Sequence, residues 1–230
     1  MFEHALAAGS IGSLRLRNRI VMGSMHLGIE SDGAALAAFY AERARGGAGL
    51  IVTGGSSVSR VGAGGRNYSF INDPQGAPPL RQAAAAVHEA GGQIALQLFH
   101  AGRYALYASF GLRPVAPSAI PSRFSPDPPH ALTGDEIRET IGDFARGAVR
   151  ARELGFDAVE VMASEGYLLN QFLSPLTNRR DDDWGGDVER RMRLPREVLR
   201  EIRACAGADF PVIFRISGAD LMPGSTNPAE

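Results

Sequence analysis

The chain has 230 residues and carries 24 Lys and Arg against 25 Asp and Glu, so its formal net charge is −1. This balance gives no electrostatic reason to expect nucleic acid or a membrane surface as a partner, and 44% hydrophobic residues exclude a disordered chain. The single cysteine, Cys205, cannot form an internal disulfide, a cysteine-rich zinc site or an iron–sulfur cluster. The N-terminus lacks a signal peptide pattern and no apolar run is long enough to span a bilayer, so we expect a cytoplasmic protein.

Short apolar runs alternate with amphipathic stretches through the first half of the chain. The pattern predicts a hairpin segment at 13–18, strands at 19–24, 49–54 and 93–98, and helices at 34–45 and 79–90. Glycine pairs at 46–47 and 91–92 follow the two helices, and glycine is the residue that most readily ends a helix. Each predicted strand of this half is therefore separated from the next by a helix.

The second half continues the alternation after a long proline-rich loop, which is predicted from about 99 to 132. Thr133 followed by Glu136 has the spacing of a capping box, and the helix it begins continues to Leu154. Strands are predicted at 156–161 and 210–215, with a charged helix at 187–206 between them. Pro195 is expected to kink or split that helix.

Strands joined by helices of this length require crossover connections, so the sheet is predicted to be parallel. Five such units fit either a doubly wound sheet or part of a (β/α)₈ TIM barrel. The barrel is favoured because the glycine-rich segment at 62–67 fails the dinucleotide-binding pattern, and because polar residues follow every predicted strand. We therefore predict a truncated (β/α)₈ barrel with about five βα units.

Two polar residues interrupt strands that otherwise read as buried. Gln97 is either a core amide bonded to the backbone or an amide that pairs with a planar heterocycle carrying adjacent C=O and N–H groups. Arg215 is either half of a structural ion pair, with Glu160 as the candidate partner, or a cation that stabilises an anion or a ring that becomes negative on reduction.

Three further residues near strand ends can carry protons. Tyr167 follows the fourth strand, and a phenol with an ordinary pKa near ~10 is protonated at neutral pH and can protonate a developing carbanion. Taken alone, a loop tyrosine is more often a packing residue. His26 and His100 are expected to be hydrogen-bonded histidines at the barrel rim.

The run Asp181-Asp182-Asp183 could suggest a metal site. Because it adjoins Arg179 and Arg180 and precedes an arginine-rich helix, we favour a loop held by salt bridges.

With these features in place, the chain resembles the old yellow enzyme (NADH:flavin oxidoreductase) family of FMN-containing barrels, and within it the 2,4-dienoyl-CoA reductase and trimethylamine dehydrogenase branch. Four blocks carry the resemblance, in order along almost the whole chain: residues 16–26, 39–44, 97–103 and 160–186. The resemblance implies a small-molecule substrate, FMN as the cofactor and NAD(P)H as the reductant.

The resemblance also assigns roles at matching positions. Ser24, Met25 and His26 would lie beside the isoalloxazine near N5 and O4, and Gly55 would border the ring. Gln97 would pair with the pyrimidine edge, and Arg215 would face N1 and O2. Tyr167 would donate a proton to the substrate, with Glu165 assisting as a proton relay. An ene-reductase acting on an unsaturated acyl-CoA or an enone is the implied activity.

Two departures from the family pattern qualify this implication. Many relatives carry a His–His or His–Asn pair where this chain has Met162 and Glu165. The chain is also shorter than a full barrel of about 250 residues. We therefore expect residues 1–230 to be the N-terminal portion of an FMN-binding barrel, without strands six to eight or downstream domains. An iron–sulfur cluster and FAD would belong only to a longer parent chain, and the portion alone should bind FMN weakly and aggregate readily.

Two alternative functions stay open. One is amine oxidation like that of trimethylamine dehydrogenase, which requires an aromatic cage for a cation. Its few candidate side chains are Tyr68, Tyr104, Tyr107 and Trp184. The other is an inactive fragment that has lost the FMN phosphate site.

Overall fold

The computed structural model describes residues 2–106, 111–125 and 127–226. Its main sheet has strands in the order β11-β10-β7-β4-β3, and every pairing along this path is parallel. The bounds of these strands are β3 Val21–Met22, β4 Leu50–Val52, β7 Ile94–Phe99, β10 Ala158–Ala163 and β11 Val212–Ile216. Each strand lies beside the one before it in the chain, without the reversal of order that marks a doubly wound sheet. The prediction of a partial (β/α)₈ barrel is confirmed.

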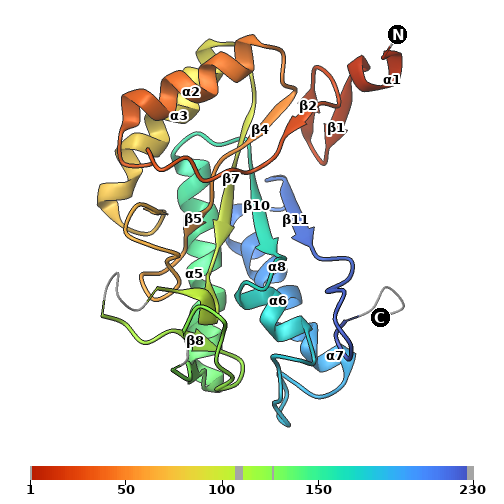
Figure 1. Cartoon of the computed structure of the whole chain (residues 1–230). Helices are drawn as coiled ribbons and strands as arrows, with labels where there is room; N and C mark the ends of the chain where they lie inside the picture. Colours follow the sequence, from red (N-terminus) through yellow and green to blue (C-terminus); the bar gives the residue numbers. More distant parts are fainter. Residues whose placement is uncertain (1, 107–110, 126, 227–230) are drawn as a thin grey trace.

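Helices connect the strands of this sheet. They are α2 Gly33–Arg45, α3 Ala77–Glu89, α5 Gly134–Glu153, α6 Leu168–Leu173, α7 Val188–Arg191 and α8 Arg193–Ala206. Helix α2 packs beside α3 and α5 beside α8 (Figure 1). The predicted capping box is present: the Thr133 hydroxyl accepts from the Glu136 N–H, and the Glu136 carboxylate accepts from the Thr133 N–H. None of the described helices is long and apolar enough to cross a membrane.

Shorter elements complete the described chain. They are α1 Glu3–Leu6, β1 Gly9–Ile11, β2 Leu14–Leu16, β5 Ser56–Ser57, β6 Ser69–Phe70, η1 Pro74–Gly76, η2 Gly102–Tyr104, β8 Val115–Ala116 and β9 His130–Ala131. Strands β1 and β2 form the predicted hairpin, which begins at Gly9, earlier than the alternating pattern indicated. Figure 1 shows this hairpin at the end of the sheet from which β7, β10 and β11 start. The other end of the sheet is therefore free to carry the polar strand ends.

The helix predicted at 187–206 is divided just before Pro195. Helix α7 ends at Arg191 and α8 begins at Arg193, with Met192 between them. Pro195 has no N–H to donate to the carbonyl of Arg191, four residues earlier, and Arg191 is the residue at which α7 ends. The predicted split of this helix at Pro195 therefore agrees with the structure.

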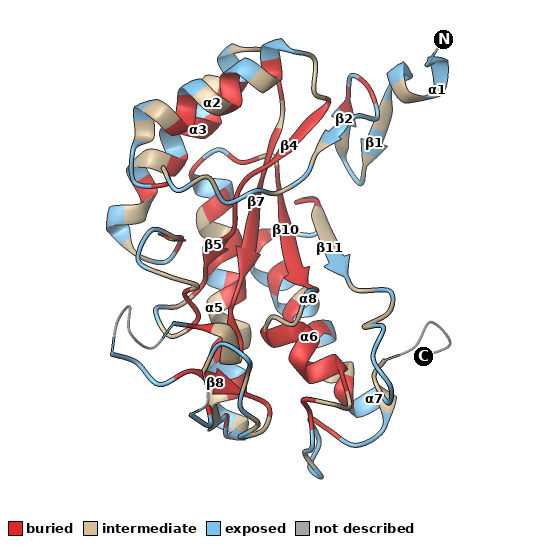
Figure 2. Ribbon diagram, viewed as in Figure 1, coloured by how far each residue is buried: buried red, intermediate tan, exposed pale blue. Residues whose placement is uncertain are grey.

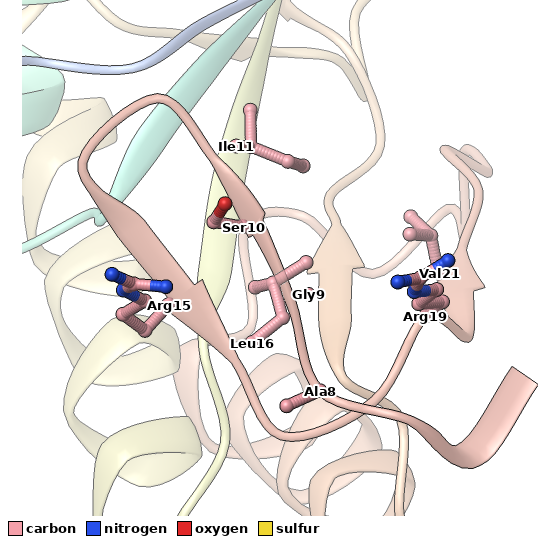
Figure 3. Close-up of a pocket in the computed structure, with 8 residues that line it drawn as sticks. All are labelled: Ala8, Gly9, Ser10, Ile11, Arg15, Leu16, Arg19 and Val21. Carbon is pink, nitrogen blue, oxygen red and sulfur yellow. The ribbon is translucent and has the colours of Figure 1, made fainter. Parts of the chain in front are cut away.

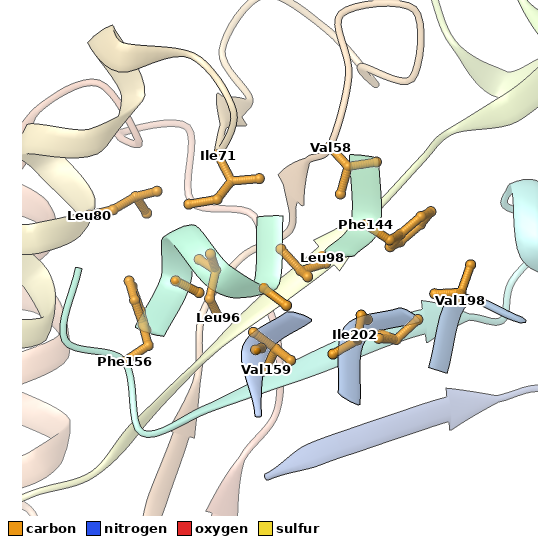
Figure 4. Packing of buried hydrophobic residues seen from close by; sticks show 14 of the residues in the cluster. Val58, Ile71, Leu80, Leu96, Leu98, Phe144, Phe156, Val159, Val198 and Ile202 are labelled. Carbon is orange, nitrogen blue, oxygen red and sulfur yellow. The ribbon is translucent and has the colours of Figure 1, made fainter. Parts of the chain in front are cut away.

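The core lies between the sheet and the helices packed on it. All residues of β4, β7 and β10 are buried, as Figure 2 shows for the central strands. Leu96 and Leu98 of β7 pack in one cluster with Phe144 of α5 and Ile202 of α8 (Figure 4). The continuous apolar runs of the sequence thus correspond to strands covered on both faces.

The two outer strands of the main sheet expose apolar side chains. Strand β11 pairs only with β10 along the described path, and Ile216 at its end is 57% exposed. Strand β3 pairs with β4, and Val21 in β3 is 46% exposed. Exposed apolar strand edges favour association with other chains, in line with the expectation that this portion aggregates readily.

Candidate active site

A cavity of about 140 Å³ lies where the strands of the main sheet end. All eight residues that the sequence assigned to a site line it: Ser24, Met25, His26, Gly55, Gln97, Glu165, Tyr167 and Arg215. Tyr68, Phe99 and Met162 complete the lining. Because parallel strands present their carboxyl ends at one edge, residues up to 191 positions apart in the chain converge here, from Ser24 to Arg215.

Gln97 is held by side chains from both neighbouring segments. Its amide oxygen accepts from the Ser24 hydroxyl (2.9 Å), and its amide nitrogen donates to Oε1 of Glu160 (2.7 Å). The alternative that its amide is bonded to the backbone is therefore wrong. An ionised carboxylate accepts hydrogen bonds but does not donate them, so the amide nitrogen of Gln97, and not its oxygen, must face Glu160. One N–H and one lone pair of the amide remain for a ligand.

Gly55 lets Phe99 and Gln97 approach the backbone closely. A Cβ atom built at this position would lie 2.8 Å from a Phe99 ring carbon and 3.0 Å from the Gln97 amide oxygen. Any side chain here would displace one of these two groups or fill the hollow between them. The bare backbone thus forms part of the cavity wall.

Arg215 does not pair with Glu160, as the ion-pair alternative proposed. Its Nε and Nη2 both donate to Oε1 of Glu165, at 3.1 and 2.6 Å. Glu165 has φ +62°, the left-handed conformation that glycine favours, at the turn that follows β10. The hydrogen bond to Glu165, the largest effect, raises the pKa of the Arg215 guanidinium further, so the group stays charged.

Tyr167 lies among aromatic rings at the same end of the sheet. Its ring centroid is 5.7 Å from that of Phe99 and 6.1 Å from that of Tyr104. Burial is the main reason that its pKa is raised above the ordinary value, and nearby Tyr68, Glu165 and Tyr104 raise it further. The phenol therefore keeps its proton at neutral pH.

His26 and His100 occupy different surroundings. His26 lines the cavity, and its Nδ1 lies 2.8 Å from Oε1 of the buried Glu30. His100 is buried rather than at the rim, which corrects the prediction, and its Nδ1 accepts from the Gly102 N–H (3.0 Å). Burial lowers the pKa of His100 to about 3, so this ring is neutral at physiological pH.

The neutral, buried His100 should make the fold sensitive to mild acid. Its unfolded pKa is near 6.5 and its folded pKa about 3, so its contribution is complete above pH 6.5 and is lost as pH falls toward 3. Over that range it should cost about 1.4 kcal/mol per pH unit. Urea unfolding at stepped pH should show a steeper loss for the native chain than for His100→Gln; parallel curves would contradict this origin.

The aspartate run forms a salt-bridged loop, as predicted. Asp182 pairs with Arg180 (2.6 Å) and Asp183 with Arg193 (3.1 Å). Over the described part of the chain, no cluster of three or more His, Cys, Asp or Glu side chains could hold a metal ion. Trp184 is buried in this loop under the Arg193 guanidinium and does not line the cavity. It cannot belong to an aromatic cage there, and Tyr107, also named for that cage, lies outside the described residues.

Sequence reasoning did not assign three residues that shape the cavity. Phe99 and Tyr68 form its aromatic wall, and Glu30 holds His26. Tyr68 was considered only for an amine cage. Glu160 was considered only as a partner for Arg215, although a carboxylate between Val159 and Val161 in a buried strand was the signal of a specific polar contact.

A second and larger hollow, about 640 Å³, lies beside the β1–β2 hairpin. It is lined by backbone and by Ile11, Leu16 and Val21, with Arg15 and Arg19 as its charged side chains (Figure 3). It lies at the start of the strands, away from the predicted site residues. Barrel enzymes build their active sites at the opposite end, so we assign the candidate active site to the smaller cavity.

Comparison with known proteins adds independent evidence. The profile of the NADH:flavin oxidoreductase / NADH oxidase family matches residues 10–230. A metal reductase of Desulforamulus reducens is 48% identical over 223 residues, which are 96% of this chain and 33% of that protein. An NADPH dehydrogenase of Listeria monocytogenes is 39% identical over 215 residues, which are 91% of this chain and 62% of the relative.

Solved structures show the same relation. A 2-naphthoyl-CoA reductase in complex with 2-naphthoyl-CoA superposes with a TM-score of 0.92 at 29% identity, covering 100% of this chain and 37% of that one. Morphinone reductase in complex with tetrahydroNAD has a TM-score of 0.89 at 32% identity, and the match covers 97% of this chain and 66% of that one. The chain thus spans between a third and two thirds of the length of these relatives.

Proposed function

Because the chain belongs to the NADH:flavin oxidoreductase / NADH oxidase family, we propose that its cavity binds the isoalloxazine ring of FMN and supports the reduction of an activated C=C bond by NAD(P)H. The substrate would be an unsaturated acyl-CoA or an enone. The observation that carries the proposal is the convergence on one cavity of the eight residues to which the family resemblance assigns roles. On this view residues 1–230 are the N-terminal portion of the barrel.

The cavity suits a flat heterocycle in two respects. Gly55 has no side chain to displace Phe99 or Gln97, so both groups stay at the cavity wall. Gln97, fixed by Ser24 and Glu160, keeps one donor and one acceptor for the edge of a ring with adjacent C=O and N–H groups. The groups that hold the FMN phosphate follow strands seven and eight in the family, so the described residues would supply the ring-facing part of the site.

Each cavity residue would then have a distinct task. Bound FMN supplies hydride to the electron-poor carbon of the substrate. Gln97 and Ser24 orient the ring, and Arg215 brings a positive charge that favours an anion. Glu165 holds that guanidinium through Oε1, which leaves Oε2 for a proton relay beside Tyr167.

The proton for the neighbouring substrate carbon would come from Tyr167. Its raised pKa keeps the hydroxyl protonated until charge develops on the substrate. Met162, at a position where many relatives carry a histidine, offers no hydrogen-bond donor. A hydrogen-bond donor that anchors a substrate carbonyl would therefore have to be a different residue of the cavity.

The proposal is tested by flavin binding to the purified 230-residue chain. Titration with FMN should quench flavin fluorescence in proportion to protein added, and Gln97→Leu should weaken binding by about tenfold, the value of one hydrogen bond in such a site. Arg15→Ala, beside the other hollow, is the matched control and should bind as the native chain does. Equal binding by the native chain and Gln97→Leu, or no binding by either, would contradict the proposal.

Turnover separates the two oxidoreductase functions. With NAD(P)H present, loss of a dienoyl-CoA would support alkene reduction. Oxidation of a methylated amine without dienoyl-CoA consumption would favour the amine dehydrogenase alternative instead.

A further inference from the structure

Glu30 is a buried carboxylate that the proposed reaction does not use. Only 5% of it is exposed. Its Oε1 accepts from the Leu27 N–H (2.7 Å) and lies 2.8 Å from Nδ1 of His26, while Oε2 has no hydrogen-bond partner among the described residues. Burying a carboxylate is costly unless its contacts are specific. In the part of the chain that the structure describes, its one side-chain partner is His26, which therefore points to its role.

The backbone around Glu30 is built to accommodate it. A Cβ atom at Gly54 would lie 2.6 Å from the Met25 carbonyl oxygen and 3.3 Å from Oε1 of Glu30. The Gly54 N–H donates to the hydroxyl of Tyr40, a buried residue of α2 (2.9 Å). Residues from the β3 loop, the end of β4 and helix α2 thus fix the position of the carboxylate.

The ring of His26 is constrained in a second direction. It stacks on the ring of Tyr68 with a centroid separation of 3.9 Å and an interplanar angle of 3°. The stack sets the plane of the imidazole, and Glu30 sets its rotation within that plane. Because an ionised carboxylate can only accept, the nitrogen that faces it, Nδ1, carries a proton.

We propose that Glu30 is a positioning residue for His26, which holds the ring with its proton on Nδ1 so that Nε2 is the nitrogen offered to the cavity. A neutral ring then presents an acceptor there, and a protonated ring presents a donor. The chemical partner is a hydrogen-bonding edge of the planar heterocycle bound in the cavity. Only the identity of that partner rests on the proposed function; the tautomer does not.

The tautomer can be measured on the chain without flavin. In ¹⁵N-labelled protein, the ring nitrogens of His26, assigned with a His26→Gln variant, should show Nδ1 protonated and Nε2 unprotonated in the neutral form of the ring. Glu30→Gln should populate both tautomers, because an amide can either donate or accept. Nε2–H as the native tautomer, or an unchanged tautomer in Glu30→Gln, would overturn the proposal.

A matched control is available on the surface. His130 also pairs with a carboxylate, Glu136 (2.9 Å), but this pair is only half-buried and neither residue lines the cavity. Glu136→Gln should leave the His26 resonances unchanged. If Glu30→Gln fails to fold, the tautomer of His26 measured in the native chain still tests the proposal.

FMN titration gives the second readout. Glu30→Gln should weaken FMN binding by about tenfold, and Glu136→Gln should not. If the His26 tautomer changes in Glu30→Gln but the affinity for FMN does not, then Nε2 does not face the flavin. That result would overturn the assignment of the flavin as the partner of Nε2. Absence of FMN binding by the native chain would contradict the proposed function and leave the tautomer result standing.

Discussion

Tyr167→Phe should slow alkene reduction by about 10²- to 10⁴-fold, the usual contribution of a positioned general acid. The substitution removes one oxygen and keeps the ring that packs against Phe99 and Tyr104. Reduction of the bound flavin by NAD(P)H needs no proton from this phenol and should remain near the native rate. Stopped-flow measurement of the two half-reactions separates these effects.

Tyr104→Phe provides the matched control for this experiment. Its ring lies 6.1 Å from that of Tyr167, but Tyr104 does not line the cavity. Loss of its hydroxyl should leave both half-reactions unchanged. If Tyr167→Phe slowed both half-reactions equally, Tyr167 would act in flavin binding or in folding, and another group would have to protonate the substrate.

Phe144→Ala should lower the free energy of unfolding by about 3–5 kcal/mol, the usual cost of deleting a buried phenyl ring. Phe144 is fully buried in α5, and its cluster includes Leu98 of β7 and Ile202 of α8. The ring therefore joins the sheet to two of its helices. Urea unfolding followed by circular dichroism measures the change.

Phe2→Ala deletes the same ring where it is 81% exposed, and it should change stability by less than about 0.5 kcal/mol. A loss for Phe144→Ala no larger than that for Phe2→Ala would mean that the core closes around the cavity or that α5 is not required for the cooperative fold. The comparison thus tests the packing of α5 on the sheet directly.

The βα alternation was predictable because each buried strand is an uninterrupted apolar run and each helix carries its own start and stop signals. The capping box at Thr133 is one such local signal, and it is present in the structure. Strands β5 and β6 were missed because each has two residues, too few for a periodic pattern. The division of the last long helix was predictable because Pro195 cannot donate a hydrogen bond to the carbonyl of Arg191, where α7 ends.

The gathering of the site residues followed from topology, since parallel strands end at one edge of the sheet. The hydrogen-bond and ion-pair partners of those residues could not be predicted from topology. For Arg215 the strand position of Glu160 suggested that residue as a candidate partner, whereas the structure pairs Arg215 with Glu165, which lies in a left-handed turn just past that strand. No local pattern predicts φ +62° for a glutamate.

Chain order and hydrophobic pattern were sufficient to specify the strand sequence, the parallel sheet and the edge at which polar residues collect, because these depend on local periodicity and on the geometry of crossover connections. Tertiary structure alone decided which polar side chains meet: Glu160 with Gln97, Glu165 with Arg215, and Glu30 with His26. Such pairs depend on side-chain directions and backbone turns to within about 1 Å, since hydrogen bonds weaken steeply outside their short range, and a sequence pattern carries no information at that scale.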